Sequence, residues 1–361
     1  MKTVERGGRQ RQWALGAAVA SGLLLTAGCE TGGDGTSPGA GLALDCSIPQ
    51  NEIFNGGPGK DGIPALTNPA TTAVGGEGLS YLRDDDRVMG IRVGDEILAV
   101  PLNILWWHEI VNLDLGGRRL AVTHCPLTGS SLIFDREPLG GAEFGVSGLL
   151  FRNNLMMYDR TTGESLWPQM ARSARCGPRD GTALSMFPVV EMTWEGWRTL
   201  YPETRVVTSA TGFSRDYRVY PYGDYDRIDN DLLLFPIGHV DTRRPPKERI
   251  LGVPSGGGGK AYPFGELASL GPTAVVQEGG VAVFWDEGRQ AAMAYWATLD
   301  GNAMTFSGNG AAITDTETGS TWSVDGSALS GPLAGRRLEA VPEAYLAYWF
   351  AWAVFQPDTL S

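Results

Sequence analysis

The sequence contains few residues that do chemistry at neutral pH, with three histidines and four cysteines among 361 residues. No His-x-x-x-His pair is present, which excludes the commonest helical zinc-binding pattern. After the first 28 residues, no apolar run approaches the roughly 20 residues that a membrane-spanning helix needs, so we expect a soluble body. Basic residues are outnumbered, 29 against 41, and the net charge of −12 argues against nucleic acid as a partner.

The first 28 residues have the pattern of an export signal. A basic start is followed by the apolar and small-residue run Trp13 to Leu25, and small residues then precede Cys29. This pattern resembles a bacterial lipoprotein signal, so we predict that residues 1–28 are removed and that Cys29 is lipidated. An ordinary secretory signal or an uncleaved anchor is the alternative. Residues 29–44 predict a flexible tether to the membrane. We therefore expect an exported lipoprotein of the cell envelope, on the periplasmic side or the cell surface.

The composition and an internal sequence repeat predict the architecture. The 50 glycines and 22 prolines leave only short apolar runs, which favours a mainly β fold with minor helices. Several Asp, Thr, Gly and Trp residues recur at a nearly constant offset, namely Asp159, Thr162, Gly163 and Trp167 as Asp315, Thr318, Gly319 and Trp322. We predict an internally duplicated unit whose two β-rich halves, residues 45–210 and 247–361, pack together across a linking segment, residues 211–246.

Local patterns predict individual elements around the first half's rare residues. Gly94-Asp95 predicts a hairpin turn, because short apolar strands flank it. Apolar residues at helical spacing predict a helix from Pro101 to Asn112, and alternation predicts strands over 119–125, 130–136, 144–151 and 154–158. Short helices are expected over 192–201 and 345–355. In the predicted register of the two halves, Cys125 falls opposite Asp286 and His124 opposite Trp285, so the second half lacks the thiol and the imidazole.

The adjacent pair His124-Cys125 is the most distinctive chemistry in the chain. A thiol beside an imidazole can be a nucleophile, a redox centre or a metal ligand. We predict that Cys125 acts as a thiolate with a lowered pKa, assisted by His124 or by His108, and that Thr128 donates to it or shapes the turn. The alternatives are an inert buried cysteine and a core histidine bound to a backbone carbonyl. Glu109 is expected to be solvated.

Several longer motifs resemble the uncharacterised DUF3179 family of prokaryotic proteins. They are Pro101-Leu-Asn-Ile-Leu-Trp-Trp-His-Glu-Ile-Val-Asn112, His124-Cys-Pro-Leu-Thr-Gly129, Phe134-Asp-Arg136, Gly145-Val-Ser-Gly148, Met157-Tyr-Asp-Arg160, Ser165-Leu-Trp167, Pro221-Tyr-Gly223, Thr318-Gly-Ser-Thr-Trp322 and Gly331-Pro-Leu-Ala-Gly335. The resemblance covers roughly residues 75–361 and implies an envelope or exported protein with no established activity. It also implies that relatives carry Cys-Pro-Leu-Cys, some with selenocysteine first, at the position of Cys125 to Thr128. Both features suggest redox or soft-metal chemistry at Cys125, but Thr128 removes the second thiol of a thioredoxin-like pair.

Three functions remain open on this reading. The leading hypothesis is a thiol oxidoreductase. In it, Cys125 attacks a peroxide or disulfide, and the oxidised Cys125 is then reduced by a small thiol or a protein redox partner. Cys176 then resolves the oxidised Cys125, or instead bridges to Cys46. The second hypothesis is a copper or zinc site that uses Cys125, His124 and His108, with Met156, Met157 or Cys176 as a further ligand. The third is a non-catalytic lipoprotein that binds a ligand or a partner between its two halves.

Overall fold

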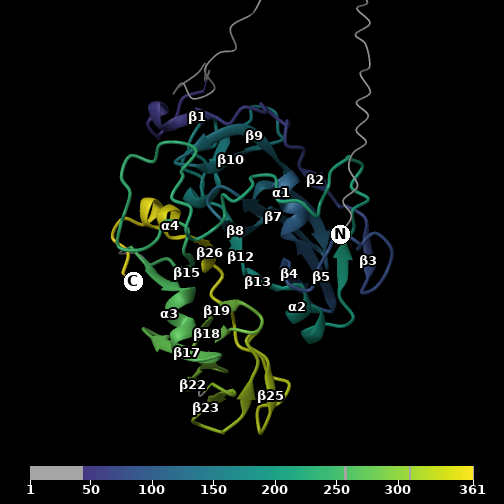
Figure 1. Ribbon diagram of the computed structural model, residues 1–361, viewed down its shortest axis with the longest axis vertical. Helices are drawn as coiled ribbons and strands as arrows, with labels where there is room; N and C mark the ends of the chain where they lie inside the picture. Colours follow the sequence, from purple (N-terminus) through teal and green to yellow (C-terminus); the bar gives the residue numbers. More distant parts are fainter. Residues whose placement is uncertain (1–43, 256–257, 309, 361) are drawn as a thin grey trace, which may run out of the picture. The chain divides into compact units, whose positions relative to one another are not determined.

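The computed structural model describes residues 44–255, 258–308 and 310–360, and its fold is mainly β (Figure 1). Strands make up 39% of the residues and helices 11%, in several sheets, so the predicted class is confirmed. The predicted signal peptide and the lipidation site Cys29 lie outside the described residues, as does the tether apart from residue 44. No helix in the described part of the chain is long and apolar enough to cross a membrane.

The elements follow one another in two series. Those of residues 44–210 are η1 (Gln50–Glu52), β1 (Ile53–Asn55), β2 (Leu66–Thr67), β3 (Thr71–Ala73), β4 (Arg87–Val93), β5 (Glu96–Pro101), α1 (Leu102–His108), β6 (Ile110–Leu115), β7 (Arg118–Cys125), β8 (Ser130–Asp135), η2 (Glu137–Leu139), β9 (Phe144–Phe151), β10 (Asn154–Asp159), β11 (Leu166–Pro168), η3 (Gln169–Ala171), β12 (Ser185–Phe187), β13 (Val190–Thr193), α2 (Trp194–Leu200) and β14 (Arg205–Val207). Those of the C-terminal series are β15 (Arg249–Val253), β16 (Lys260–Pro263), α3 (Phe264–Ser269), β17 (Thr273–Glu278), β18 (Val281–Asp286), β19 (Ala291–Trp296), β20 (Thr298–Leu299), β21 (Asn302–Ala303), β22 (Phe306–Gly308), β23 (Ile313–Asp315), β24 (Thr321–Trp322), β25 (Ala328–Ser330), β26 (Tyr345–Tyr348) and α4 (Trp349–Phe355).

The predicted hairpins and strands around the first half are confirmed. β4 pairs antiparallel with β5 across Gly94-Asp95, and Gly94 takes a φ of 59°, which suits glycine in a two-residue turn. β6, β7 and β8 form an antiparallel meander in which Cys125, at the end of β7, lies opposite Ser130. The meander places Cys125 next to the tight turn that leads into β8.

Each of the three predicted helices is shorter than expected. α1 ends at His108 because Glu109 leaves the helical region, with φ 57° and ψ −31°, and the β-branched residues after it pair with β7. α2 and α4 begin only at Trp194 and Trp349, since the residues before them are strands β13 and β26. Apolar helical spacing alone does not separate a short helix from the strand that adjoins it.

The two series of elements share one sheet. Its order is β16-β15-β26-β8-β7-β6-β2, and β26 of the second series pairs with β8 of the first through Leu346 and Ser131 (Figure 1). A second contact between the two series is a backbone hydrogen bond at 3.0 Å, in which the N–H of Thr193 in β13 donates to the carbonyl of Arg289, beside β19. The predicted packing of the two series against each other is therefore present as strand pairing.

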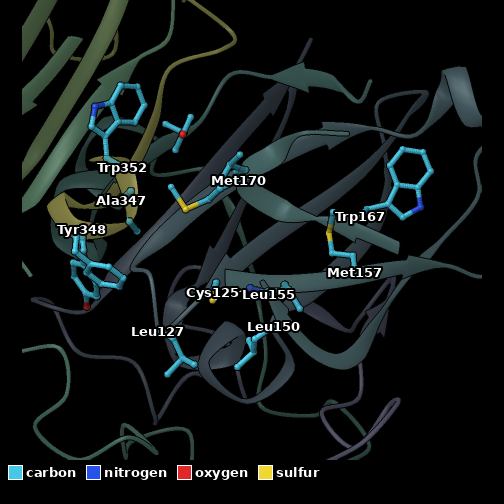
Figure 2. Packing of buried hydrophobic residues seen from close by; sticks show 14 of the residues in the cluster. Cys125, Leu127, Leu150, Leu155, Met157, Trp167, Met170, Ala347, Tyr348 and Trp352 are labelled. Carbon is cyan, nitrogen blue, oxygen red and sulfur yellow. Dashed lines mark hydrogen bonds between the residues drawn. The ribbon is translucent and has the colours of Figure 1, made fainter. Parts of the chain in front are cut away.

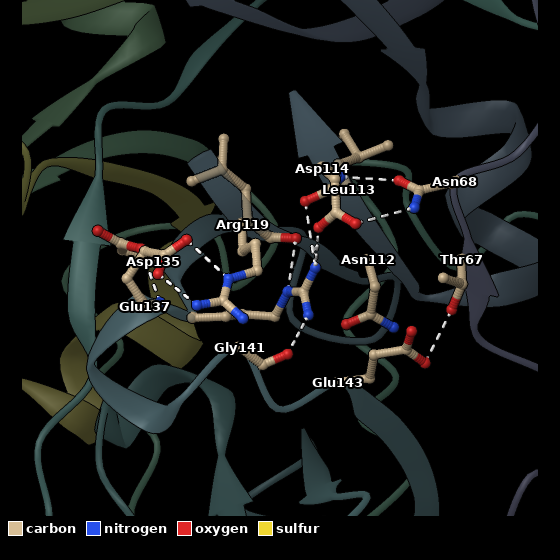
Figure 3. A network of polar contacts seen from close by, with 12 residues as sticks. Thr67, Asn68, Asn112, Leu113, Asp114, Arg119, Asp135, Glu137, Gly141 and Glu143 are labelled. Atoms are coloured by element: carbon tan, nitrogen blue, oxygen red, sulfur yellow. Dashed lines mark hydrogen bonds and ion pairs between the residues drawn. The ribbon is translucent and has the colours of Figure 1, made fainter. Parts of the chain in front are cut away.

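A polar network closes the end of the meander that lies away from Cys125 (Figure 3). The buried guanidinium of Arg136 donates to the carbonyls of Leu113 and Leu120 and to the Asp114 carboxylate, at 3.0 to 3.1 Å. The Asn112 side chain bonds both backbone groups of Phe144, which joins β6 to β9. These contacts satisfy backbone groups at strand ends and have a structural role.

Candidate functional site

The Cys125 thiol is fully buried among apolar side chains (Figure 2). Its Sγ donates to the carbonyl oxygen of Asn153 at 3.7 Å and accepts the backbone N–H of Leu155 at 3.4 Å. Burial raises the pKa of the thiol to about 11, and the nearby Glu109 carboxylate adds to the rise. The hydrogen bond from the Leu155 N–H and the nearby polar groups of Thr128 lower this pKa, but by less. The expected thiolate with a lowered pKa is therefore not what this environment favours.

The two candidate histidines have other partners than the thiol. His124 points to the opposite face of β7, where its Nδ1 lies 3.1 Å from the Ser131 hydroxyl, and burial lowers its pKa to about 3. His108 bonds the carbonyl of Pro64 through Nδ1 at 2.7 Å and the Tyr217 hydroxyl through Nε2 at 2.8 Å. Burial lowers the pKa of His108 as well. Both rings are neutral at pH 7, and the expected imidazole assistance to Cys125 is not formed.

The proposed metal ligands are not brought together. No group of three His, Cys, Asp or Glu side chains that could hold a metal ion occurs within the described ranges. Alternation along β7 separates His124 from Cys125, and His108 is turned toward Tyr217 on the linking segment. The set Cys125, His124 and His108 therefore does not converge on one point.

The other two cysteines of the described chain form a disulfide. Cys46 and Cys176 are bonded across a sequence separation of 130 residues. Of the two roles considered for Cys176, the bridge to Cys46 is the one present. The role of resolving thiol for Cys125 is wrong for this state, because the Cys176 sulfur is already bonded.

Thr128 belongs to a buried hydrogen-bond network beside the thiol. Its hydroxyl lies 2.8 Å from the Ser130 hydroxyl and accepts from the Asn154 amide at 3.1 Å. Gln169 joins the same network by accepting from Ser130 at 2.6 Å and donating to Thr123 at 2.8 Å. Because the Ser130 hydroxyl donates to Gln169, the Thr128 hydroxyl donates to Ser130 and not to the sulfur. The Thr128 N–H donates to the Cys125 carbonyl oxygen at 3.2 Å, so of the two predicted roles Thr128 has the one of shaping the turn.

A second buried network surrounds Glu191 on the His124 face of the sheet. Its carboxylate accepts from Arg87 at 2.8 Å, from Arg249 at 2.9 Å and from the Ser131 hydroxyl at 2.6 Å. Glu191 is fully buried, whereas the arginine side chains keep about a fifth of their surface exposed. Burial opposes ionisation, but the attraction of both guanidinium groups lowers the pKa of Glu191. The sequence carries no local signal for this cluster, because its four members come from four different strands, β4, β8, β13 and β15.

For Glu109, the prediction of a solvated side chain is wrong. It is only 5% exposed, and its left-handed φ of 57° is unusual for a residue other than glycine. Its N–H donates to the Leu105 carbonyl and its carbonyl accepts from the His124 N–H, both at 2.8 Å, so the backbone holds the conformation. Burial raises the pKa of the carboxyl to about 8. A strained backbone with a perturbed acid marks a candidate functional residue.

The Glu109 side chain lines a cavity of about 490 Å³. The wall is mainly apolar and combines α1, the β9–β10 hairpin, the segment before β2 and the linking segment. Its larger members are Ile63, Trp106, Trp107, Leu127, Leu149, Leu150, Leu155, Pro221, Tyr222, Leu234 and Phe235, with Arg215 as a second charged residue. Cys125 packs in the same apolar cluster as Leu127, Leu150 and Leu155 (Figure 2). A mostly apolar cavity with few polar groups is the usual form of a small-molecule site.

Two polar anchors fix the linking segment over this cavity. The Asn153 side chain bonds both backbone groups at Phe235, donating to the carbonyl and accepting the N–H. The buried ammonium group of Lys247 donates to the carbonyls of Tyr225, Asn230 and Leu232 at 2.7 to 3.0 Å. These contacts compensate for the few regular hydrogen bonds within the segment, so the cavity wall is held in place.

Comparison with known proteins assigns the family. A family model described as "Protein of unknown function (DUF3179)" matches residues 60–359. The chain belongs to the DUF3179 family. No curated protein and no solved structure matches it. The DUF3179 region contains Glu109, Cys125 and Glu191, whereas Cys46 precedes it, so the disulfide ties the segment before the family region to that region. Because the description gives no activity, membership of the DUF3179 family assigns no reaction to these residues.

The rate at which iodoacetamide modifies Cys125 tests whether the thiol is buried and protonated. A pKa of about 11 leaves on the order of one thiol in 10,000 ionised at pH 7, and burial blocks the reagent as well. We expect iodoacetamide to modify Cys125 in the folded chain at least about 100-fold more slowly than in urea-unfolded chain. Peptide mass mapping of timed samples measures both rates. Complete modification of the folded chain within minutes would contradict the structure's account of this sulfur.

Proposed function

We propose that the chain binds a small, largely apolar molecule in the cavity lined by Glu109. The observation that carries this proposal is the Glu109 carboxyl itself, which is 5% exposed, strained in its backbone and placed in an otherwise apolar wall. Leaving a carboxyl in such surroundings is costly, so a role in holding a ligand explains its presence better than a role in stability. The sequence suggested a ligand between the two halves, whereas this cavity is lined by the first half and the linking segment.

We further infer that the two series of elements are copies of one unit, which gives an internal control for the site. In each series, a hairpin ends at a proline that precedes a short helix, Pro101 before α1 and Pro263 before α3. A three-stranded antiparallel meander follows each helix, β6-β7-β8 and β17-β18-β19. Near its end, each series has a strand that leads directly into a helix, β13 into α2 and β26 into α4. The order and pairing of the elements support duplication.

Equivalent tryptophans make equivalent contacts in the two series. Trp197 lies against Gly90 of β4, and Trp352 lies against Gly252 of β15, so that a Cβ at either glycine would collide with the indole. The two indole N–H groups donate to threonines that follow α2 and α4 at corresponding positions, Thr204 and Thr359. In the same way, Trp167 donates to Asp159 at 2.8 Å and Trp322 donates to Asp315 at 2.9 Å.

The two series differ where the candidate chemistry lies. The strand pair His124–Ser131 of the first corresponds to Trp285–Ala292 of the second, and Glu191 corresponds to Leu346. These three counterparts are buried together in an apolar cluster. Since an apolar interior suffices for the fold in the second series, the buried polar groups of the first are not needed for folding alone. This contrast supports a functional role for the first series.

Glu109 follows the same pattern. It stands as many residues after Pro101 as Gly271 stands after Pro263, and both residues take a positive φ, 57° for Glu109 and 125° for Gly271. Glycine is the residue that fits such a conformation without strain. The first series carries a glutamate at a position suited to glycine, which supports retention of its side chain for ligand contact.

Binding of a hydrophobic dye tests the proposed cavity. We expect N-phenyl-1-naphthylamine to gain fluorescence on binding, and a Leu149→Trp variant, which fills the cavity, to bind it at least about 10-fold more weakly. Leu329→Trp, at a side chain that is 63% exposed, provides the matched control and should bind the dye as the wild type does. Equal binding by both variants and the wild type would place the dye elsewhere and would refute the proposal.

Thiol chemistry at Cys125 is the second candidate, and one observation favours it. The sulfur receives a hydrogen bond from the Leu155 N–H at 3.4 Å, which stabilises a thiolate once one forms. In this mechanism, a ligand that opens the cavity exposes the Cys125 thiol to a peroxide or disulfide, which oxidises it. A small thiol or a protein partner then reduces the oxidised Cys125. Modification of Cys125 that accelerates on ligand binding would favour this candidate over simple binding, and a rate unaffected by ligand would count against it.

We also propose that the chain works outside the cytoplasm, attached to a membrane by lipid on Cys29. The Cys46–Cys176 disulfide supports an oxidising compartment, because such bridges are rare in cytosolic proteins. Intact-mass analysis of the mature chain purified from membranes tests this, since lipidation adds the mass of the acyl groups and removes residues 1–28.

A further inference from the structure

The Glu109 carboxyl has no partner of opposite charge. No hydrogen bond or ion pair reaches its side-chain oxygens from any residue in the described ranges, and burial is the only influence on its pKa. An isolated buried carboxylate is strongly disfavoured. The carboxyl must therefore either keep its proton or be paired with a positive charge on the bound molecule.

The cavity wall is suited to the positive charge. Trp106, Trp107, Tyr222 and Phe235 line it with Glu109, and aromatic faces attract organic cations by their negative electrostatic potential. The chain as a whole carries a net charge of −12, which raises the local concentration of cations. The one cationic residue of the wall, Arg215, is exposed, and its guanidinium carbon lies 5.6 Å from the centroid of the Trp107 ring.

We infer that the ligand of this cavity is an apolar organic cation, an amine whose ammonium group is paired with the Glu109 carboxylate. This inference rests on the proposed binding function and adds the chemical class of the ligand. On binding, the carboxyl of Glu109 loses its proton to solvent and the ammonium N–H groups donate to the resulting carboxylate. The apolar part of the molecule then contacts Leu127, Leu150 and Phe235. A neutral or anionic ligand would leave the proton on Glu109.

The other ionisable groups around Glu109 are not expected to release or take up a proton when the ligand binds near pH 7. Cys125 and Tyr222 face the same region, and burial raises the pKa of both, so both stay neutral near pH 7. His108 is occupied by Pro64 and Tyr217, and burial lowers its pKa. Proton release on binding near pH 7 therefore reports on Glu109.

Calorimetry with matched probes tests the inference on the full chain. Titration with 2-phenylethylamine at pH 7 in two buffers of different ionisation enthalpy should show release of about one proton per amine bound. Glu109→Gln should weaken amine binding by at least about 10-fold and abolish proton release, because the carboxamide cannot pair with the ammonium. Binding of the neutral isostere 2-phenylethanol should release no proton and should change little in the variant. Glu77→Gln, at an exposed carboxylate, serves as the control.

The outcomes separate the two proposals. Binding of the alcohol or of 3-phenylpropionate as tightly as the amine, with no proton release, would overturn the amine inference and leave the binding function intact. An Arg215→Gln variant should bind the amine slightly more tightly, whereas weaker amine binding by this variant would also count against a cationic ligand. Failure of every probe to bind, together with failure of the dye, would overturn the binding function itself.

Discussion

Replacing Glu191 by glutamine should lower the free energy of unfolding by about 3–5 kcal/mol, because it removes the buried charge that two largely buried guanidinium groups share. Arg87 and Arg249 would then lie close together with no anion between them, and the Ser131 hydroxyl would lose its charged acceptor. Urea unfolding at pH 7, followed by tryptophan fluorescence, measures the change. Glu195→Gln, four residues further along the chain in α2 and exposed, should change stability by no more than about 0.5 kcal/mol.

The same carboxylate predicts how stability varies with pH. The two arginines lower the pKa of Glu191 in the folded state relative to its usual value of 4.5. A carboxyl with a lowered folded-state pKa contributes stability above its unfolded pKa, and this contribution is lost as the pH falls through the folded pKa. The wild type should therefore lose its advantage over Glu191→Gln on acidification below about pH 4.5, and an advantage that is unchanged in acid would contradict the assigned ion pairs.

Removing the Cys46–Cys176 disulfide should cost about 2–5 kcal/mol, because the bridge closes a loop with a sequence separation of 130 residues and restricts the unfolded chain. The bridge also holds the segment around Leu44 and Ile48 against Phe151 and Leu166. The double variant Cys46→Ser/Cys176→Ser and the wild type treated with reductant should show the same lowered urea midpoint.

Two further measurements make the disulfide prediction specific. The double variant should not respond to reductant, since its one cysteine among the described residues, Cys125, is unpaired. A thiol assay under denaturing conditions verifies that the wild type is reduced. Reduced wild type with an unchanged midpoint would show that the bridge does not stabilise the fold.

Short-range patterns were enough to predict the strands around the site. The Gly94-Asp95 turn, the alternation in β7 and the length of β9 all depend on residues that are neighbours in sequence. The helix α1 was predicted too long, because the apolar spacing continues through Ile110 and Val111 although those residues pair in β6. A helix end that depends on one strained residue leaves no local pattern.

The candidate site was only partly predictable for a related reason. Cys125 and Thr128 were singled out by rarity and position, and they do lie beside one another. Glu109 was expected in solvent because helical periodicity places it away from the apolar face. The linking segment around Phe235, more than a hundred residues later, helps to enclose it. Contacts of such long sequence separation have no signature in the local pattern.

The amino-acid sequence by itself determined the mainly β class, the turns and meander of the first half, the family resemblance and the location of the rare thiol and imidazoles. Tertiary structure alone decided that the thiol is buried and protonated, that the imidazoles bind other partners, and that two carboxylates, Glu109 and Glu191, carry the unusual electrostatics. The reason is physical. Hydrogen bonding within strands and turns is local, whereas desolvation and charge pairing depend on every segment that folds against a group.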